Sequence, residues 1–243
     1  MKTIHIIILS LITLSLSACG NDSLLGDAAG DSNPSLQGTL HLAITHHLSD
    51  ETALPLTNNQ KIGSNNLGFQ LALEEAKISF KTLKLLSAGD DPDCEAGHDQ
   101  VLNLDVTENL MAEDLKKSTL GDFLIPKIAY CRFEITLGGG ASGSTFHLVM
   151  TWSKDGASGT LDLQSTEEVL ISGVFMAEED GAFIEHPLHF HANDSETEKV
   201  FGIEYDTLFQ DVDFSTMTSP EMTSKILSNM SEALHQDIPS HGT

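Results

Sequence analysis

Apolar and polar residues alternate with a period of two along many short segments of this chain, and this pattern limits the folds that it can adopt. In the first such segment, Leu40, Ile44 and His46 fall on one face, whereas His41 and His47 fall on the other. Successive side chains of a β-strand point to opposite faces, so the alternation predicts a strand with one buried face.

Further strand patterns follow at hairpin-like spacing, separated by turn signals such as Asp155-Gly156 and Asp180-Gly181. One of these strands is expected to carry an irregularity between residues 80 and 83. Many short strands joined by polar turns predict an all-β fold, an antiparallel β-sandwich of about nine strands. The expected strands are residues 40–47, 69–73, 78–85, 101–106, 128–137, 145–152, 169–175, 183–192 and 200–205.

One helix is predicted near the C-terminus, over residues 220–235. Thr218 is a favourable N-cap, and Pro220 suits the first turn because the N–H that it lacks would have no helical partner there. Met222 and Met230 belong to an apolar stripe that recurs every four residues, which predicts a helix packed on the sandwich. Both methionines are expected in the core rather than at a copper site.

The N-terminus resembles a bacterial lipoprotein signal. Residues 4–16 are almost wholly apolar, a run with the length of a signal-peptide core and too short to span a bilayer. The run ends in Leu16-Ser17-Ala18-Cys19, which resembles the lipobox of bacterial lipoproteins. The resemblance implies cleavage before Cys19 and lipidation of that cysteine. An ordinary signal peptide that is cut after Ala18 is the alternative.

Three segments are therefore expected: a signal peptide over residues 1–18, a flexible tether over residues 19–35 and a single domain over residues 36–243. The tether is rich in Asn, Asp, Ser and Gly and has little to bury. By analogy with lipoprotein sorting, Gly20 after the lipidated cysteine favours attachment to the outer membrane, facing the periplasm.

The charge of the chain argues against one class of partner. The chain has 12 basic and 36 acidic side chains and a net charge of −24. Such a chain repels phosphate backbones, so we expect no nucleic-acid partner. The acidic excess either keeps the protein soluble or attracts cations, and composition leaves both explanations open.

Two cysteines remain after Cys19. Cys94 and Cys131 form an even pair in an oxidising compartment, which predicts a disulfide. A thiolate metal site is the alternative, but the two cysteines lack the C-x-x-C spacing typical of such sites.

Histidine is the residue type that most suggests chemistry. His189 and His191 are two residues apart on a predicted strand, so their imidazoles are expected on one face, with Cβ atoms roughly 6–7 Å apart. Such a pair can chelate copper or zinc. His41, His47 and His147 lie on polar strand faces and are the expected further ligands. Ordinary solvated surface histidines are the alternative.

An acidic loop over residues 89–99 is a second candidate site, because clustered carboxylates can hold calcium. It lacks the EF-hand spacing, so calcium is expected less than copper or zinc, and a solvated loop held by Cys94 is the alternative. The chain contains no nucleophile elbow, metalloprotease, P-loop or dinucleotide-binding motif, so we expect no enzyme activity.

Several pieces of the sequence occur in an order that resembles a known family. They are Leu40 to His46 followed by Gly68-Phe69-Gln70-Leu71, then Leu102-Asn103-Leu104-Asp105-Val106, Phe133 to Gly138, Met150-Thr151-Trp152, Ile171-Ser172-Gly173 and Phe190-His191. This order is similar to that of the MbnP-like periplasmic copper-binding proteins, which are often lipoproteins and occur with a di-haem partner of the MbnH type. Together the pieces span most of the chain after Cys19.

The resemblance implies a copper site and a periplasmic di-haem partner protein. The implied ligands are a first-strand histidine (His41, His46 or His47), an oxidised Trp152 and His191. The W-x-W-x-x-G-Y-x-F stretch of the family is represented here by Trp152 alone. Trp152 also continues the apolar face of its strand, so a role in the core is the simpler expectation.

The sequence therefore predicts a membrane-anchored periplasmic lipoprotein that binds copper or zinc for storage or delivery, without catalysis. The alternative is a cell-envelope interaction module that binds a partner protein or a glycan without metal.

Overall fold

The computed structural model describes residues 36–89, 94–139, 143–179, 182–190 and 194–237. The strands of these residues form two main sheets and one small hairpin sheet. The helices are α1 (Tyr205–Leu208) and α2 (Ser219–Ala233). The strands are β1 (Gln37–His47), β2 (Leu56–Thr57), β3 (Gln60–Ser64), β4 (Gln70–Leu86), β5 (Gln100–Asn109), β6 (Ser118–Pro126), β7 (Arg132–Leu137), β8 (Phe146–Lys154), β9 (Ala157–Ser165), β10 (Val169–Val174), β11 (Met176–Glu179), β12 (Ala182–Glu185), β13 (Glu196–Glu204) and β14 (Leu234–Asp237).

The predicted fold class is confirmed: the chain is mostly strand, in several antiparallel sheets, with one longer helix near the C-terminus. There are more strands than the expected nine. The additional strands include Leu56–Thr57, Gln60–Ser64, Ser118–Pro126 and Ala157–Ser165. Within the expected strand over residues 183–192, β12 ends at Glu185, and the described residues 186–190 lie outside it.

The first sheet has the strand order β14-β13-β1-β6. Its central pair differs from the antiparallel expectation, because β1 and β13 run parallel, with Ile44 opposite Phe201. The connection between these two strands contains the whole second sheet, so no tight hairpin turn fixes their relative direction. The second half of β1 is buried on both faces, as parallel strands commonly are.

The second sheet is organised by β4, which is 17 residues long. The first half of β4 lies between β3 and β8, and its second half lies between β5 and β7. The pairing register of β4 shifts between Phe80 and Thr82, which confirms the irregularity expected there, and again between Leu73 and Glu75. Bulges of this kind bend a strand, which allows one strand to serve both halves of the sheet.

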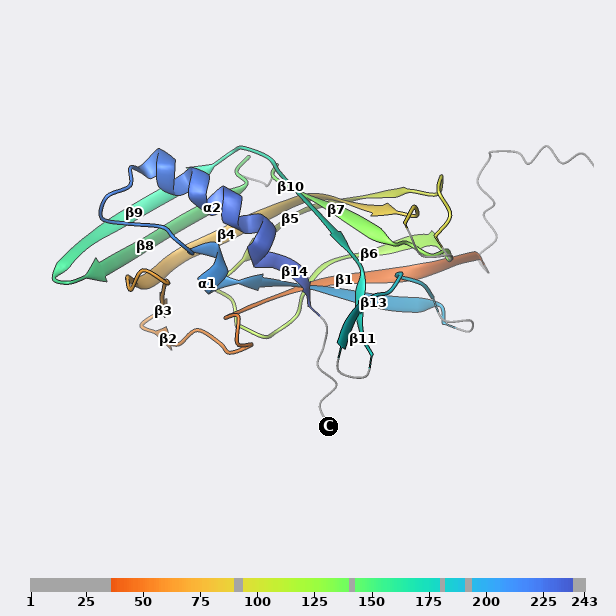
Figure 1. Cartoon of the computed structure of the whole chain (residues 1–243), viewed down its shortest axis with the longest axis horizontal. Helices are drawn as coiled ribbons and strands as arrows, with labels where there is room; N and C mark the ends of the chain where they lie inside the picture. Colours follow the sequence, from red (N-terminus) through yellow and green to blue (C-terminus); the bar gives the residue numbers. More distant parts are fainter. Residues whose placement is uncertain (1–35, 90–93, 140–142, 180–181, 191–193, 238–243) are drawn as a thin grey trace, which may run out of the picture. The chain divides into compact units, whose positions relative to one another are not determined.

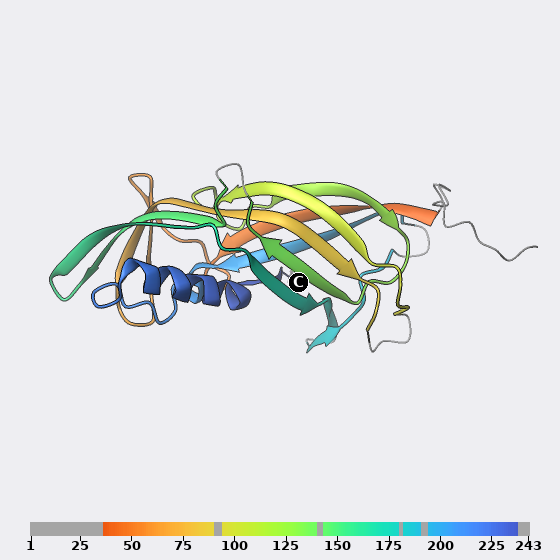
Figure 2. The ribbon, with the colours of Figure 1, turned by 90° about the horizontal axis from the view of Figure 1, so that it is seen from above.

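The hydrophobic core lies between the two main sheets. Figure 1 shows β1 and β13 running below β4, β5 and β7, and Figure 2 shows the same layers from above. The rings of Phe133 in β7 and Phe201 in β13 meet with their centroids 5.2 Å apart, so they join the two layers directly.

Helix α2 begins and packs as the sequence predicts, but it ends two residues earlier. A capping box joins Thr218 and Glu221, and Pro220 lies in the first turn. Met222 and Met230 are buried in the core, as expected. The helix ends at Ala233 because the next four residues form β14, which pairs antiparallel with β13.

The predicted disulfide between Cys94 and Cys131 is present, with a Cα–Cα distance of 6.2 Å. It ties the segment before β5 to the residue that precedes β7. Neither helix in the described parts of the chain is long and apolar enough to cross a bilayer.

Candidate functional site

The structure places His41 and His147 among carboxylates on the surface. The Nδ1 atom of His41 lies 2.7 Å from Asp122, and hydrogen bonding to this carboxylate raises the pKa of His41. His147 lies 3.0 Å from Asp162 and 3.3 Å from Glu75. Both imidazoles therefore contact carboxylates, and they lie on different sheets.

His189 does not project from a strand, which corrects the geometry expected for it. The strand β12 ends at Glu185, and the following residues form a loop held by a single bridge between Leu188 and Tyr130. Phe190 in this loop packs against the core, whereas His189 faces His186, with ring centroids 4.9 Å apart. Residues 183–192 alternate as a strand does, but Pro187 has no N–H to donate to a strand ladder, which interrupts the pairing there.

Other predicted sites lie partly or wholly outside the described residues. These include Cys19, His191 and the aspartates at positions 90, 91 and 93 of the acidic loop. Among the residues that the structure describes, no three or more His, Cys, Asp or Glu side chains are grouped so that they could hold a metal ion.

Trp152 lies at the edge of the core. It packs edge-on against Phe69, with ring centroids 5.6 Å apart. Its indole also lies against Gly159 of β9, where a Cβ atom would come within 2.7 Å of the indole nitrogen. This placement agrees with the structural role that its strand pattern predicts.

A pair of histidines that sequence reasoning did not connect lies on the outer face of the first sheet. His47 is the last residue of β1, and His235 lies in β14, on the other side of β13. Their rings meet edge to face, with centroids 5.7 Å apart. Gly202 of β13 lies between them, and a Cβ atom on this glycine would be 2.9 Å from the Nε2 atom of each histidine. Both nitrogens therefore lie close to Gly202, on the same face of the sheet.

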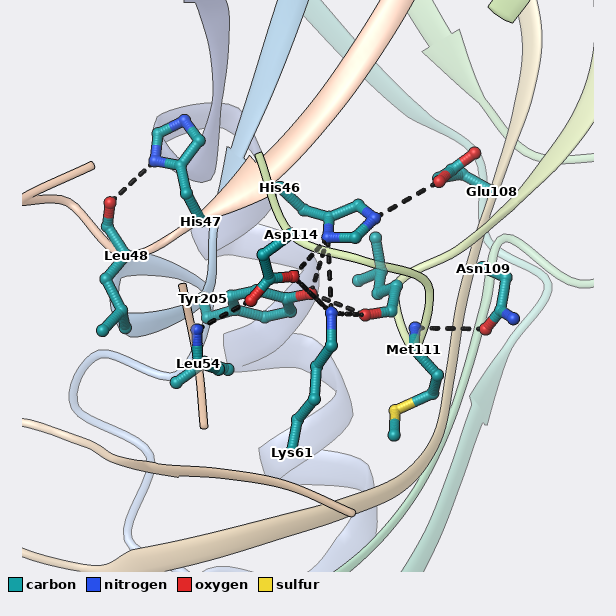
Figure 3. Close-up of polar contacts among 11 residues, drawn as sticks. His46, His47, Leu48, Leu54, Lys61, Glu108, Asn109, Met111, Asp114 and Tyr205 are labelled. Atoms are coloured by element: carbon teal, nitrogen blue, oxygen red, sulfur yellow. Dashed lines mark hydrogen bonds and ion pairs between the residues drawn. The ribbon is translucent and has the colours of Figure 1, made fainter. Parts of the chain in front are cut away.

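Hydrogen bonding fixes which nitrogen of His47 is free to bind. Its Nδ1 atom lies 2.7 Å from the Leu48 carbonyl oxygen (Figure 3), which can only accept a hydrogen bond. Nδ1 of His47 therefore carries the proton, and in the neutral ring the lone pair is on Nε2. Metal-binding histidines are typically oriented in this way, by donation from the other ring nitrogen to a carbonyl or carboxylate.

His235 has a related but looser arrangement. Its buried Nδ1 atom has no hydrogen-bond partner among the residues that the structure describes, and Oε1 of Glu204 lies 3.8 Å from it. The side chain of His235 is 35% exposed, whereas His47 is almost fully buried. His235 is thus the more exposed ring of the pair, and the Glu204 carboxylate lies beside it.

His46, the neighbour of His47, points to the inner side of β1 and belongs to a buried ionic cluster, formed by His46, Lys61, Glu108, Asp114 and Tyr205 (Figure 3). Asp114 is at its centre, and its Oδ1 atom accepts hydrogen bonds from His46 Nδ1 at 2.6 Å and from Lys61. Tyr205 lies 2.9 Å from the same oxygen. Glu108 lies 3.4 Å from Nε2 of His46.

The cluster lies out of reach of solvent, which perturbs its acid–base equilibria. Burial raises the pKa of Asp114, but hydrogen bonds from His46, Lys61 and the Leu54 N–H outweigh it and hold the pKa below its usual value. Burial lowers the pKa of Lys61, and Asp114 offsets only part of this effect. Burial also lowers the pKa of His46, yet the bonds to Asp114 and Glu108 leave it raised.

Comparisons with known proteins found no match to this chain among protein families, curated proteins or solved structures. The histidine pair above Gly202 and the buried ionic cluster therefore have to be interpreted from their own geometry and chemistry.

Proposed function

We propose that this chain is a lipid-anchored protein of the cell envelope that binds copper, and zinc less tightly, for storage or delivery. Its protein ligands are the Nε2 atoms of His47 and His235. The observation that carries the proposal is the approach of both nitrogens to Gly202, each 2.9 Å from the place that a Cβ atom on this glycine would take.

The donor set favours copper. Zinc sites use three or four protein ligands, and a pair of imidazoles falls short of that number. For the same nitrogen ligands, Cu²⁺ binds more tightly than Zn²⁺. The net charge of −24 raises the local concentration of cations near the protein. His47 is also one of the first-strand histidines that the resemblance to MbnP-like proteins implicates.

The anchor in this proposal is Cys19, which lies outside the described residues. It is supported by the lipobox-like Leu16-Ser17-Ala18-Cys19 after an apolar run. Several acyl chains on one cysteine give stable attachment where a single chain gives only marginal binding.

The site is tested by competition titration of the full-length protein with copper and with zinc. The His235→Ala variant should lose roughly 100-fold or more in copper affinity. Losing a ligand weakens metal binding at least as much as losing a group that only orients a ligand. The Gly202→Ala variant should also bind weakly although both histidines remain, because its methyl group would come within 2.9 Å of each Nε2 atom and push both rings out of place.

His41→Ala is the matched control, since His41 lies on the same face of β1 but is paired with Asp122. It should bind copper as the wild type does. Thermal unfolding of each variant separates loss of the site from loss of the fold. Equal copper affinity in wild type, His235→Ala and Gly202→Ala would reject the site, and an interaction module without metal would then be the better hypothesis.

A further inference from the structure

The strongest feature that metal binding does not use is the contact between Lys61 and Asp114 in the buried ionic cluster. The side chains of Lys61 and Asp114 are 2% and 1% exposed. Lys61 belongs to β3, whereas Asp114 lies in the connection between β5 and β6. A lysine and an aspartate from distant parts of the chain are thus in direct contact in a water-excluded site.

From this geometry we infer that Lys61 and Asp114 become joined by an intramolecular amide bond between Nζ and Cγ. This covalent cross-link would tie β3 to the segment that leads into β6. The inference is independent of the histidine pair and of metal binding, because His47 and His235 take no part in it.

The nucleophile is held in place by three groups. Nζ of Lys61 contacts Oδ1 of Asp114, and it donates to the Leu110 carbonyl at 2.6 Å and to the Tyr205 hydroxyl at 2.8 Å. The carbon to be attacked is one bond beyond the oxygen that Nζ contacts. Reactants held in this way react far faster than free ones, because the entropy of bringing them together is already lost on folding.

The electrophile is polarised by donors on both oxygens. The backbone N–H of Leu54 donates to Oδ2 of Asp114 at 2.7 Å, where it would stabilise the negative charge of a tetrahedral intermediate. Oδ1 accepts from His46 at 2.6 Å, and Tyr205 lies 2.9 Å from it. Oδ1 is therefore the oxygen that is set up to leave.

The reaction needs no other reactant. The lone pair of Nζ forms the bond to Cγ, and the bond between Cγ and Oδ1 breaks. Two of the three ammonium protons pass to Oδ1, which leaves as water, while the third stays on the amide nitrogen. An ammonium and a carboxylate are thus replaced by a neutral amide and one water molecule.

Burial favours this exchange. An ion pair inside a protein carries a large desolvation penalty that mutual attraction only partly offsets, whereas an amide carries no net charge. Burial lowers the pKa of Lys61, which makes the neutral, nucleophilic amine easier to reach, whereas the lowered pKa of Asp114 holds its carboxyl group ionised until the ammonium protons pass to it. The reaction removes Oδ1 of Asp114 from Nδ1 of His46, and Glu108, 3.4 Å from Nε2, is then the carboxylate that stays beside this imidazole.

The test is peptide mass spectrometry of the full-length wild-type protein, purified from membranes, reduced and digested with trypsin. We expect no cleavage after Lys61. We also expect a branched peptide that joins the Lys61 and Asp114 segments, at the sum of their masses less one water. Two exposed ion pairs, Lys81 with Glu168 and Lys117 with Glu198, are internal controls and should give unlinked peptides.

A Lys61→Arg variant keeps the positive charge but lacks the amine, so it should give no branched peptide. The decisive sample is the wild type, so the result does not depend on whether this variant folds. A branched peptide at any yield supports the cross-link. Complete cleavage after Lys61, with the Asp114 peptide at its unmodified mass, would overturn it.

Discussion

Replacing Asp114 with alanine is expected to lower the free energy of unfolding by about 3–5 kcal/mol, the range for removing one partner of a buried charged group. Asp114 accepts hydrogen bonds from His46, Lys61 and the Leu54 N–H, and its side chain is 1% exposed. Without it, Lys61 and His46 remain buried without their central acceptor, and the proposed cross-link to Lys61 cannot form. Urea denaturation of the purified variant measures the effect.

The control for this variant is Asp122→Ala, which removes the exposed partner of His41 and should change stability by less than about 1 kcal/mol. Converting both Lys61 and Asp114 to apolar residues, as Lys61→Met with Asp114→Leu, should recover part of the loss, because fewer unpaired charges stay buried. If the single Asp114→Ala variant were as stable as Asp122→Ala, the buried ionic cluster would not stabilise the fold, which would contradict this account.

Removing the disulfide is expected to have the second-largest effect, a loss of roughly 3–4 kcal/mol on the chain-entropy account of cross-links. Cys94 and Cys131 are 37 residues apart in the sequence, so the bond closes a loop of considerable length. The variant with Cys94→Ser and Cys131→Ser should unfold at lower urea concentration than the oxidised wild type.

Chemical reduction of the wild type provides the comparison, because it opens the bond without changing either residue. Reduced wild type and the double serine variant should have similar stability, both below the oxidised protein. If reduction left the urea midpoint unchanged, the loop would not depend on the bond for its stability.

Much of the fold was predictable because its strands carry strong local signals. The alternation around Leu40 and Ile44 marks β1, and the break after Phe80 marks the bulge in β4. The helix was predictable from Thr218 and Pro220, since capping is decided by residues close together in the sequence.

Features decided by distant residues were not predictable. The parallel pairing of β1 with β13 has no local signal, because period-two alternation is the same in both directions. Strand β14 follows helix α2 with no turn residue between them, so Leu234 and His235 were assigned to the helix. Leu234 is expected to be buried in a longer helix as well as in β14, so the hydrophobic pattern could not distinguish a helix from a strand at this position.

The candidate sites were predictable only in part. The sequence predicts His47 as a metal ligand. It places His235 in the expected helix over residues 220–235, and no residue near Gly202 indicates that two histidines lie beside this glycine. Lys61 and Asp114 have the pattern of ordinary surface residues, and their contact arises only when β3 meets the connection between β5 and β6. Contacts of this kind are determined by tertiary packing rather than by local sequence.

The central claim is that His47 and His235 bind one metal ion together, and X-ray absorption spectroscopy of the copper-loaded full-length protein tests it most directly. We predict a first shell that includes two imidazole nitrogens at about 2 Å, the usual metal–imidazole distance, with this signal absent from the His47→Ala, His235→Ala double variant. A shell without imidazole, or the same spectrum from wild type and double variant, would contradict the proposed site.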